Sequence, residues 1–305
     1  MLSQTSAPGG PGGGYGPSSW LRTFVPRPNA AVRLVCFPHA GGSVGSFRRL
    51  AGLVPGNVEL TAVQYPGRQD RYAVPLTGVM TELAGQIHRE LAPGFDRPTA
   101  FLGHSMGATV AFETARLLRP RSVPPLVALF ASARKAPHEC RPTGLDFHDP
   151  ERVRSFVREL GGSGAEHLDH EDLWDLALPM LRNDFMLVDA YRYRPGPPLG
   201  CPIVTISGAA DLRFTREDAQ HWSPYTTGAF EAHTLPGGHF YIEEHPELLA
   251  ELLADALRRL APPVGHRVTP ADTAAPTRSS ARAYGGAPRQ QQDGRPPKFV
   301  RHEPT

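Results

Sequence analysis

The 305-residue sequence has few cysteines, no excess of charge of one sign and no long apolar run. Its three cysteines (Cys36, Cys140 and Cys201) lie far apart, without the paired spacing of a zinc site, and their odd number favours reduced thiols. The formal net charge of +2 gives no nucleic-acid or polybasic membrane signal. No apolar run reaches a membrane-spanning length, and no secretory signal is visible. A cytoplasmic protein without a metal is therefore expected.

Both ends of the sequence are poor in apolar residues. Residues 1–18 are rich in Gly, Pro and Ser, and residues 262–305 carry more Arg and Lys than acidic residues. Such compositions cannot bury enough surface to fold, so we expect both segments to be disordered. The basic tail could contact an acidic partner, and a solvated extension without function is the alternative. The expected folded domain is 19–261.

Between these ends, short apolar runs alternate with segments of helical spacing. Strands are predicted at 32–37, 60–65, 100–102, 126–131, 203–206 and 230–235, and helices at 76–91, 105–118 and 247–260. Near-continuous apolar strands separated by helices indicate an α/β fold with a mostly parallel, doubly wound sheet.

The connection from 132 to 202 is longer than one crossover helix requires. It has helical spacing from Asp149 to Leu160 and from Glu171 to Tyr191. We therefore predict a helical lid insertion over about 143–195, placed over the carboxyl edge of the sheet.

Residues 103–107 read Gly-His-Ser-Met-Gly between a predicted strand and a predicted helix, which is the setting of a nucleophile elbow. A serine on so sharp a turn has a strained backbone, which is tolerable only where its neighbours lack bulk. Gly103, Gly107 and Ala108 satisfy this condition. The hydroxyl of Ser105 is therefore predicted to be an exposed nucleophile; a chance Gly/Ser turn is the alternative.

A serine hydroxyl needs a base within hydrogen-bond reach to act as a nucleophile near neutral pH. His239 follows the last predicted strand in a Gly-rich loop, and the chain order of this kind of site is Ser, acid, His. Asp211, in the loop after 203–206, is the predicted orienting acid, with a turn or cap role as its alternative. Asp184 and Asp189 are weaker candidates because both fall within the inserted helix.

An oxyanion hole requires two backbone N–H donors. Met106, directly after the nucleophile, is predicted to supply one, and Ala40 in the Gly-rich loop 38–43 the other. His39 could position this loop, although a structural role is favoured. His104 is expected to point away from substrate and to pack.

Five motifs, in order and at family-like spacing, resemble the type II thioesterases, discrete α/β-hydrolases that accompany polyketide and nonribosomal peptide assembly lines. They are Phe-Pro-His-Ala-Gly-Gly-Ser (37–43), Gln-Tyr-Pro-Gly-Arg (64–68) with Asp70 and Arg71, Gly-His-Ser-Met-Gly-Ala (103–108), Leu-Pro-Met-Leu-Arg (178–182) with Asp184, and Gly-Gly-His-Phe (237–240). The resemblance covers about 20–260. It implies an α/β-hydrolase fold and Ser105, Asp211 and His239 as the catalytic triad.

The family resemblance also implies a reaction and a partner. The reaction is hydrolysis of acyl thioesters on the phosphopantetheine arm of an acyl or peptidyl carrier protein, removing stalled or misprimed units in antibiotic biosynthesis, without a cofactor. Arg68, Arg71 and Lys135 could meet the phosphate or the acidic carrier helix, with a solvated face as the alternative. A monomer is expected. Residues that could line an acyl channel, with lid packing as the alternative, are Trp174, Met180, Phe185 and Met186.

Two other classes of function remain open. An esterase, peptidase or acyltransferase could use the same fold, since this scaffold hosts many chemistries. A non-catalytic carrier-binding module could also have the fold, although an intact set of Ser105, Asp211 and His239 argues against it. Comparison of thioester with oxygen-ester hydrolysis separates the first alternative, and serine-directed labelling separates the second.

Overall fold

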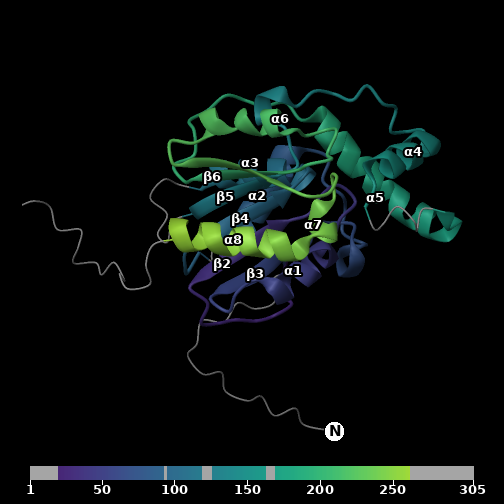
Figure 1. Ribbon diagram of the computed structural model, residues 1–305. Coiled ribbons are helices and arrows are strands. Elements are labelled where there is room, and N and C mark those ends of the chain that lie inside the picture. The colour runs from purple at the N-terminus through teal and green to yellow at the C-terminus, as the bar shows by residue number, and fades with distance from the viewer. Residues whose placement is uncertain (1–19, 93–94, 119–125, 163–168, 262–305) are drawn as a thin grey trace, which may run out of the picture. The chain divides into compact units, whose positions relative to one another are not determined.

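A seven-stranded sheet forms the centre of the computed structural model, which describes residues 20–92, 95–118, 126–162 and 169–261. The strand order is β1-β3-β2-β4-β5-β6-β7, and β1 alone of these strands runs antiparallel to its neighbour. Helices cover both faces of the sheet (Figure 1). The predicted α/β fold with a mostly parallel sheet is confirmed. The predictions for 1–18 and 262–305 lie outside the described residues.

The strands are β1 (Leu21–Arg22), β2 (Val32–Phe37), β3 (Val58–Val63), β4 (Thr99–His104), β5 (Leu126–Ser132), β6 (Ile203–Gly208) and β7 (Phe230–Leu235). The α-helices are α1 (Arg48–Leu53), α2 (Met80–Leu91), α3 (Met106–Leu117), α4 (Pro150–Leu160), α5 (Glu171–Ala190), α6 (Arg216–Gln220), α7 (Tyr241–Glu244) and α8 (Pro246–Leu260). Short 3₁₀ helices are η1 (Val44–Phe47), η2 (Gln69–Arg71), η4 (Pro137–Glu139) and η6 (Ser223–Tyr225).

These boundaries differ from the predicted ones in a few places. The second predicted strand, 60–65, is displaced, because β3 is Val58–Val63. The helix predicted from 76 begins only at Met80. The sequence analysis did not predict β1, α1 or α7, which are too short to display a hydrophobic period.

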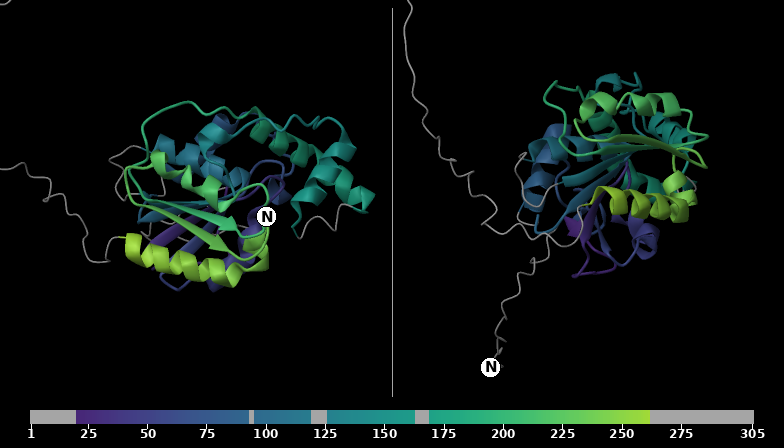
Figure 2. Two further views of the ribbon diagram at one scale, coloured as in Figure 1. Left: turned by 45° about the horizontal axis from the view of Figure 1, so that its top comes forward. Right: turned by 60° about the vertical axis from the view of Figure 1, so that its left-hand side comes forward.

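The alternation of side chains along each strand produces two apolar layers. In β2, Val32, Leu34 and Cys36 pack in the cluster that contains apolar residues of α1 and α8. Val35 and Phe37 pack in the opposite cluster, with residues of α2 and α3. Two views of the ribbon show these helix layers on the two sides of the sheet (Figure 2). Cys36 is fully buried, which agrees with its interpretation as a core side chain.

The reversal of strand order positions the site. From β2 the chain continues to β3 on one side of the sheet, and from β4 it continues to β5 on the other. Loops after β2 and β4 therefore leave the sheet in different directions, which opens a crevice at the carboxyl ends of these neighbouring strands. Because Phe37 pairs with Gly103, the residues that follow both strands begin at the same level.

Helices α4 and α5, here called the helical insertion, lie between β5 and β6 in the chain and project from one side of the sheet (Figure 1). They share an apolar cluster with the preceding loop, formed by Phe147, Val153, Trp174, Leu181 and Phe185. Asp149 caps α4 by accepting a hydrogen bond from the Glu151 N–H at 3.0 Å. The predicted limits of the lid, 143–195, stay a prediction.

Candidate active site

Ser105 lies at the turn between β4 and α3 with a backbone φ of 54° and ψ of −118°. This conformation is costly for any residue other than glycine, so the surroundings must impose it. The Ser105 N–H donates to the Ser132 carbonyl oxygen at 2.8 Å. A Cβ atom at Gly103 would lie 2.2 Å from the Gly107 carbonyl oxygen, so strand and helix approach too closely for a larger residue there.

The structure brings Ser105, Asp211 and His239 together from the ends of β4, β6 and β7. His239 Nε2 lies 3.0 Å from Ser105 Oγ, and His239 Nδ1 lies 2.8 Å from Asp211 Oδ2. The side chain of His239 is 10 % exposed and that of Asp211 is 1 % exposed. In this arrangement the imidazole can take the serine proton on one nitrogen while its other N–H donates to the carboxylate.

Asp211 makes two kinds of contact through its two carboxylate oxygens. Oδ1 accepts hydrogen bonds from the backbone N–H groups of Arg213, at 2.9 Å, and Phe214, at 3.2 Å. Oδ2 faces His239. The turn role and the orienting role, which the sequence left as alternatives, are therefore compatible in one side chain.

Main-chain contacts hold the loops of Asp211 and His239 against each other. The Ala210 N–H donates to the Gly237 carbonyl oxygen at 2.9 Å. A Cβ atom at Gly208 would lie 2.2 Å from the Gly238 carbonyl oxygen, so only glycine allows this approach.

The loop of residues 38–43, here called the oxyanion loop, lies against the turn that carries Ser105. A Cβ atom at Gly107 would lie 2.0 Å from the Phe37 carbonyl oxygen, which shows how closely the two segments meet. Met106 is in the first turn of α3, where backbone N–H groups have no acceptor within the helix. Ala40 lines the same cleft as Ser105. Both predicted donors therefore belong to segments that border the nucleophile.

Arg68 and Asp184 form a buried ion pair beside the oxyanion loop, with side chains 4 % and 1 % exposed. The desolvation of Asp184 raises the pKa of its carboxyl group, and the charge of Arg68 opposes this rise. Both predicted roles for Arg68, a carrier contact and a solvated charge, are wrong because the guanidinium is buried. Sequence reasoning missed this pair, although Asp184 shares a helix face with the apolar residues Leu181 and Leu187, and a charge on such a face is a signal of buried pairing.

The two other predicted cationic contacts also have protein partners. Arg71 is buried, and its guanidinium carbon lies 3.8 Å from the centre of the Trp20 ring, so its predicted carrier contact is wrong as well. Lys135 lies at the edge of the cleft and pairs with Asp218 at 3.1 Å.

Two further histidines, His39 and His104, lie near His239, and burial favours the neutral form of both. Burial lowers the pKa of His39 to about 4 and lowers that of His104 well below its usual value. His104 is fully buried, with Nδ1 2.8 Å from Ser132 Oγ, in agreement with its expected packing role. Neither neighbour therefore carries a positive charge next to His239 near neutral pH.

The cleft beside Ser105 has a volume of about 180 Å³. Of the four predicted channel residues, Phe185 lines it, whereas Trp174 and Met180 pack in the helical insertion and Met186 is exposed. The helical period explains this correction: Trp174 lies eleven residues, or roughly 16 Å, before Phe185 along α5, and Met180 and Met186 point in other directions. The apolar lining of the cleft includes Phe156, Leu160, Phe185, Val188, Phe214 and Phe240. The sequence signal that could have identified this lining is the helical spacing of apolar pairs such as Phe156 and Leu160.

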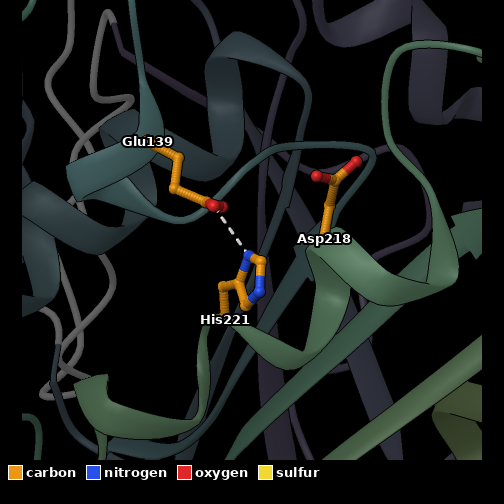
Figure 3. Close-up of side chains that lie close together, drawn as sticks. All are labelled: Glu139, Asp218 and His221. Carbon is orange, nitrogen blue, oxygen red and sulfur yellow. Dashed lines mark ion pairs between the residues drawn. The ribbon is translucent and has the colours of Figure 1, made fainter.

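Glu139, Asp218 and His221 lie close together near Lys135, each with an atom that could bind a metal, all within 4.8 Å of one another (Figure 3). His221 Nδ1 is 2.7 Å from the Glu139 carboxylate. Asp218 pairs with Lys135 and accepts a hydrogen bond from the Thr215 N–H at 2.9 Å. Because these groups already have protein partners, we interpret them as a set of polar contacts near the edge of the cleft and not as a metal site.

A serine, a histidine and an aspartate at the carboxyl ends of a mostly parallel sheet, with helices on both faces, define an α/β-hydrolase fold. The family model described as "Thioesterase domain" matches residues 32–257. The chain belongs to the thioesterase family, as the resemblance predicted.

Individual relatives agree with this membership. The chain is 37 % identical over 239 residues to "Thioesterase PikA5" of Streptomyces venezuelae, covering 78 % of this chain and 85 % of that protein. It is also 37 % identical over 238 residues to "Probable cadicidin biosynthesis thioesterase" of Streptomyces griseus, covering 78 % of this chain and 66 % of that protein. The solved structure of the type II thioesterase BorB from the borrelidin biosynthetic cluster matches with a TM-score of 0.73 and 40 % identity. The match covers 80 % of this chain and 100 % of the BorB chain.

Proposed function

We propose that the chain is a serine thioesterase whose catalytic triad is Ser105, His239 and Asp211. The observation that carries this proposal is the position of His239, 3.0 Å from the serine oxygen and 2.8 Å from the aspartate oxygen. The N–H groups of Ala40 and Met106 form the proposed oxyanion hole. Their place on the two segments that border Ser105 supports this assignment.

The reaction follows from this geometry. Ser105 Oγ attacks the thioester carbonyl carbon while His239 Nε2 takes the hydroxyl proton, and the carbonyl electron pair moves to the oxygen near Ala40 and Met106. Collapse of the intermediate breaks the C–S bond, and His239 returns the proton to the departing thiolate. His239 then deprotonates a water molecule, whose oxygen attacks the acyl carbon. The bond between this carbon and Ser105 Oγ breaks, and His239 returns the proton to Oγ, which releases the acid and restores Ser105.

The proposed substrates are acyl groups on the phosphopantetheine arm of acyl or peptidyl carrier proteins, cleared from polyketide or nonribosomal peptide assembly. The names of BorB and PikA5 and the apolar lining of the cleft support this proposal. Two cations that line the cleft, Arg134 and Arg141, contact neutral oxygens among the described residues: Thr109 Oγ1 at 3.0 Å and the His138 carbonyl oxygen at 2.6 Å. Their charges are therefore available to an anionic partner.

Intact-mass measurement of acylated carrier proteins tests this function. Carriers loaded with acyl groups of several lengths are incubated with the enzyme, and loss of the acyl mass is the expected result. Ser105→Ala should reduce the rate by roughly 10⁶-fold, as in other serine hydrolases that lose their nucleophile. Ser46→Ala, which changes a serine of η1, is the matched control and should retain activity. Strong preference for matched oxygen esters would identify an esterase instead, and absence of both activities and of fluorophosphonate labelling would identify a binding module.

A further inference from the structure

The oxyanion loop is anchored by a side chain of the helical insertion. Asp184, on α5, accepts a hydrogen bond at Oδ2 from the Gly41 N–H at 2.8 Å. Arg68 donates to the same carboxylate oxygen, and its Nε–H donates to the Gly42 carbonyl oxygen at 3.2 Å. One buried ion pair therefore binds the two residues that directly follow Ala40.

Packing and two further hydrogen bonds fix the rest of the loop. Gly41 has a φ of +77°, and a Cβ atom there would lie 2.4 Å from Leu181 Cδ2, so α5 rests directly on the loop. The Tyr65 hydroxyl donates to the Pro38 carbonyl oxygen at 3.2 Å. At the other end of the loop, the Val44 N–H donates to Gln64 Oε1 at 3.2 Å.

A buried ion pair contributes little net stability, because the cost of desolvating both charges offsets much of their attraction, and apolar side chains of similar volume often stabilise a protein equally well. Unlike apolar side chains, however, the pair fixes the directions of the backbone groups that it binds. The carboxylate of Asp184 fixes where the Gly41 N–H points, and the guanidinium of Arg68 fixes where the Gly42 carbonyl group points. Because adjacent peptide planes are joined at one Cα atom, fixing these groups also restricts the orientation of the Ala40 N–H.

We propose that Asp184 and Arg68 are positioning residues of the oxyanion hole, which hold the Ala40 N–H toward the developing oxyanion. This inference rests on the proposed role of Ala40. Since Asp184 belongs to α5, the hole is complete only while the helical insertion is seated on the oxyanion loop. A small displacement of a donor is costly in catalysis, because its hydrogen bond must meet the charge where it forms.

Asp184→Asn tests this role. The amide has nearly the shape of the carboxylate but lacks the charge that faces Arg68, so the loop loses its fixed orientation. We expect kcat to fall by about 10- to 100-fold with KM changed by less than about 3-fold, because the loss is confined to the transition state. The rate of fluorophosphonate labelling of Ser105 should fall by a similar factor, since the phosphonyl oxygen also occupies the oxyanion hole.

Glu113→Gln is the matched control. Glu113 is a buried carboxylate on α3 that pairs with Arg116 at 2.9 Å and accepts a hydrogen bond from the Tyr191 hydroxyl at 2.6 Å. It has no contact with the oxyanion loop among the described hydrogen bonds. We expect a loss of thermal stability comparable to that of Asp184→Asn, with kcat and labelling within about 2-fold of the unmodified enzyme.

A second variant separates positioning from folding. The double change Asp184→Leu and Arg68→Met replaces the pair by apolar side chains, which restores much of the stability, but it should keep the loss in labelling rate. Unchanged labelling in either Asp184 variant, or an equal loss in Glu113→Gln, overturns the proposal. Labelling does not require a thioester substrate. If the unmodified enzyme is labelled but leaves carrier thioesters intact, the proposed substrate fails while the comparison of labelling rates still decides the role of Asp184.

Discussion

The two segments that border the nucleophile are held in place by different means. The turn that carries Ser105 and Met106 is held by close backbone contacts, because Gly103 approaches Gly107 within the turn and Gly107 approaches Phe37 at the end of β2, where no larger residue would fit. The oxyanion loop is fixed mainly by side chains from elsewhere, above all Asp184, which is 143 residues away from Gly41 in the sequence. One segment is therefore held mainly by backbone contacts and the other mainly by side chains.

This difference has a consequence for how the site can vary. A segment fixed by backbone contacts tolerates almost no substitution, and changes in neighbouring side chains do not alter its conformation. A segment fixed by side chains of the helical insertion responds to any change in how α5 packs. The nucleophile is thus the constant part of the site, and the oxyanion loop is the part that the insertion can influence.

Among variants that keep the nucleophile, Asp211→Asn should have the largest effect, because it disables the imidazole while leaving both bordering segments intact. The amide can still accept the backbone hydrogen bonds of its turn through one oxygen, but it presents an N–H group to His239 and favours the wrong tautomer. We expect kcat to fall by about 10⁴-fold with little change in thermal stability, by analogy with the serine proteases. Steady-state hydrolysis of a short acyl thioester measures the effect.

Asp218→Asn is the control for this variant. Asp218 is likewise an aspartate that follows β6 and binds a backbone N–H group, but it lies in the first turn of α6 and pairs with Lys135 instead of a histidine. It should cost stability and leave kcat within a few-fold. A loss below about 10-fold in Asp211→Asn would contradict the proposed orienting role.

The same contrast explains what the sequence could predict. The turn at Ser105 was predictable because its glycines, its serine and the flanking apolar runs all lie within a few residues. The positions of His239 and Asp211 were predictable from chain order, since each residue lies in a short loop that follows a predicted strand. The parallel sheet followed from the near-continuous apolar runs, and in β2 all residues except Arg33 are buried.

The support of the oxyanion loop was not predictable in this way. Arg68 and Asp184 lie 116 residues apart, and the apolar face around Asp184 indicates a buried partner without showing which residue that partner is. The two side chains come into contact only in the folded chain, where both are buried and each is the other's charged partner. Of the predicted channel residues, Phe185 lines the cleft, whereas Trp174 and Met180 take the alternative role of packing in the insertion. Helical spacing identified α5, but it could not show which part of that long helix reaches the cleft.

Paired glycine substitutions would break the comparison between the two segments. In Gly107→Ala the new methyl group meets the Phe37 carbonyl oxygen at 2.0 Å, and neither backbone can move away. We expect a loss of more than about 4 kcal/mol, enough to prevent folding in many domains. In Gly41→Ala the methyl group meets the end of the Leu181 side chain, which can rotate, so the main cost is about 1–2 kcal/mol for the left-handed backbone.

Urea unfolding measures both variants, and Gly52→Ala on α1, where a Cβ atom meets nothing within 4 Å, is the control. The control should be neutral or slightly stabilising, because alanine favours the helix. Gly41→Ala should also lower kcat, since the shifted loop carries Ala40. Equal losses of stability in the two test variants would mean that both segments are held in the same manner, against the contrast drawn above.

His39→Asn should have the smallest effect of these variants. It tests how closely the oxyanion loop packs against the turn at Ser105, because His39 belongs to the loop and its ring centre lies 5.8 Å from that of His104, the residue before Ser105. The folded pKa of His39, about 4, is below its unfolded value, so between these values the unfolded state binds more protons. Stability from this group is therefore present near neutral pH and is lost as pH falls from about 6.5 towards 4. Between pH 7.5 and 4.5, the native enzyme should lose on the order of 2 kcal/mol more than the variant in urea unfolding, while the titration of His104 contributes to both proteins and cancels. Parallel stability curves would show that His39 is accessible to protons in the folded state and that the loop and the turn are not packed as closely as their ring contact implies.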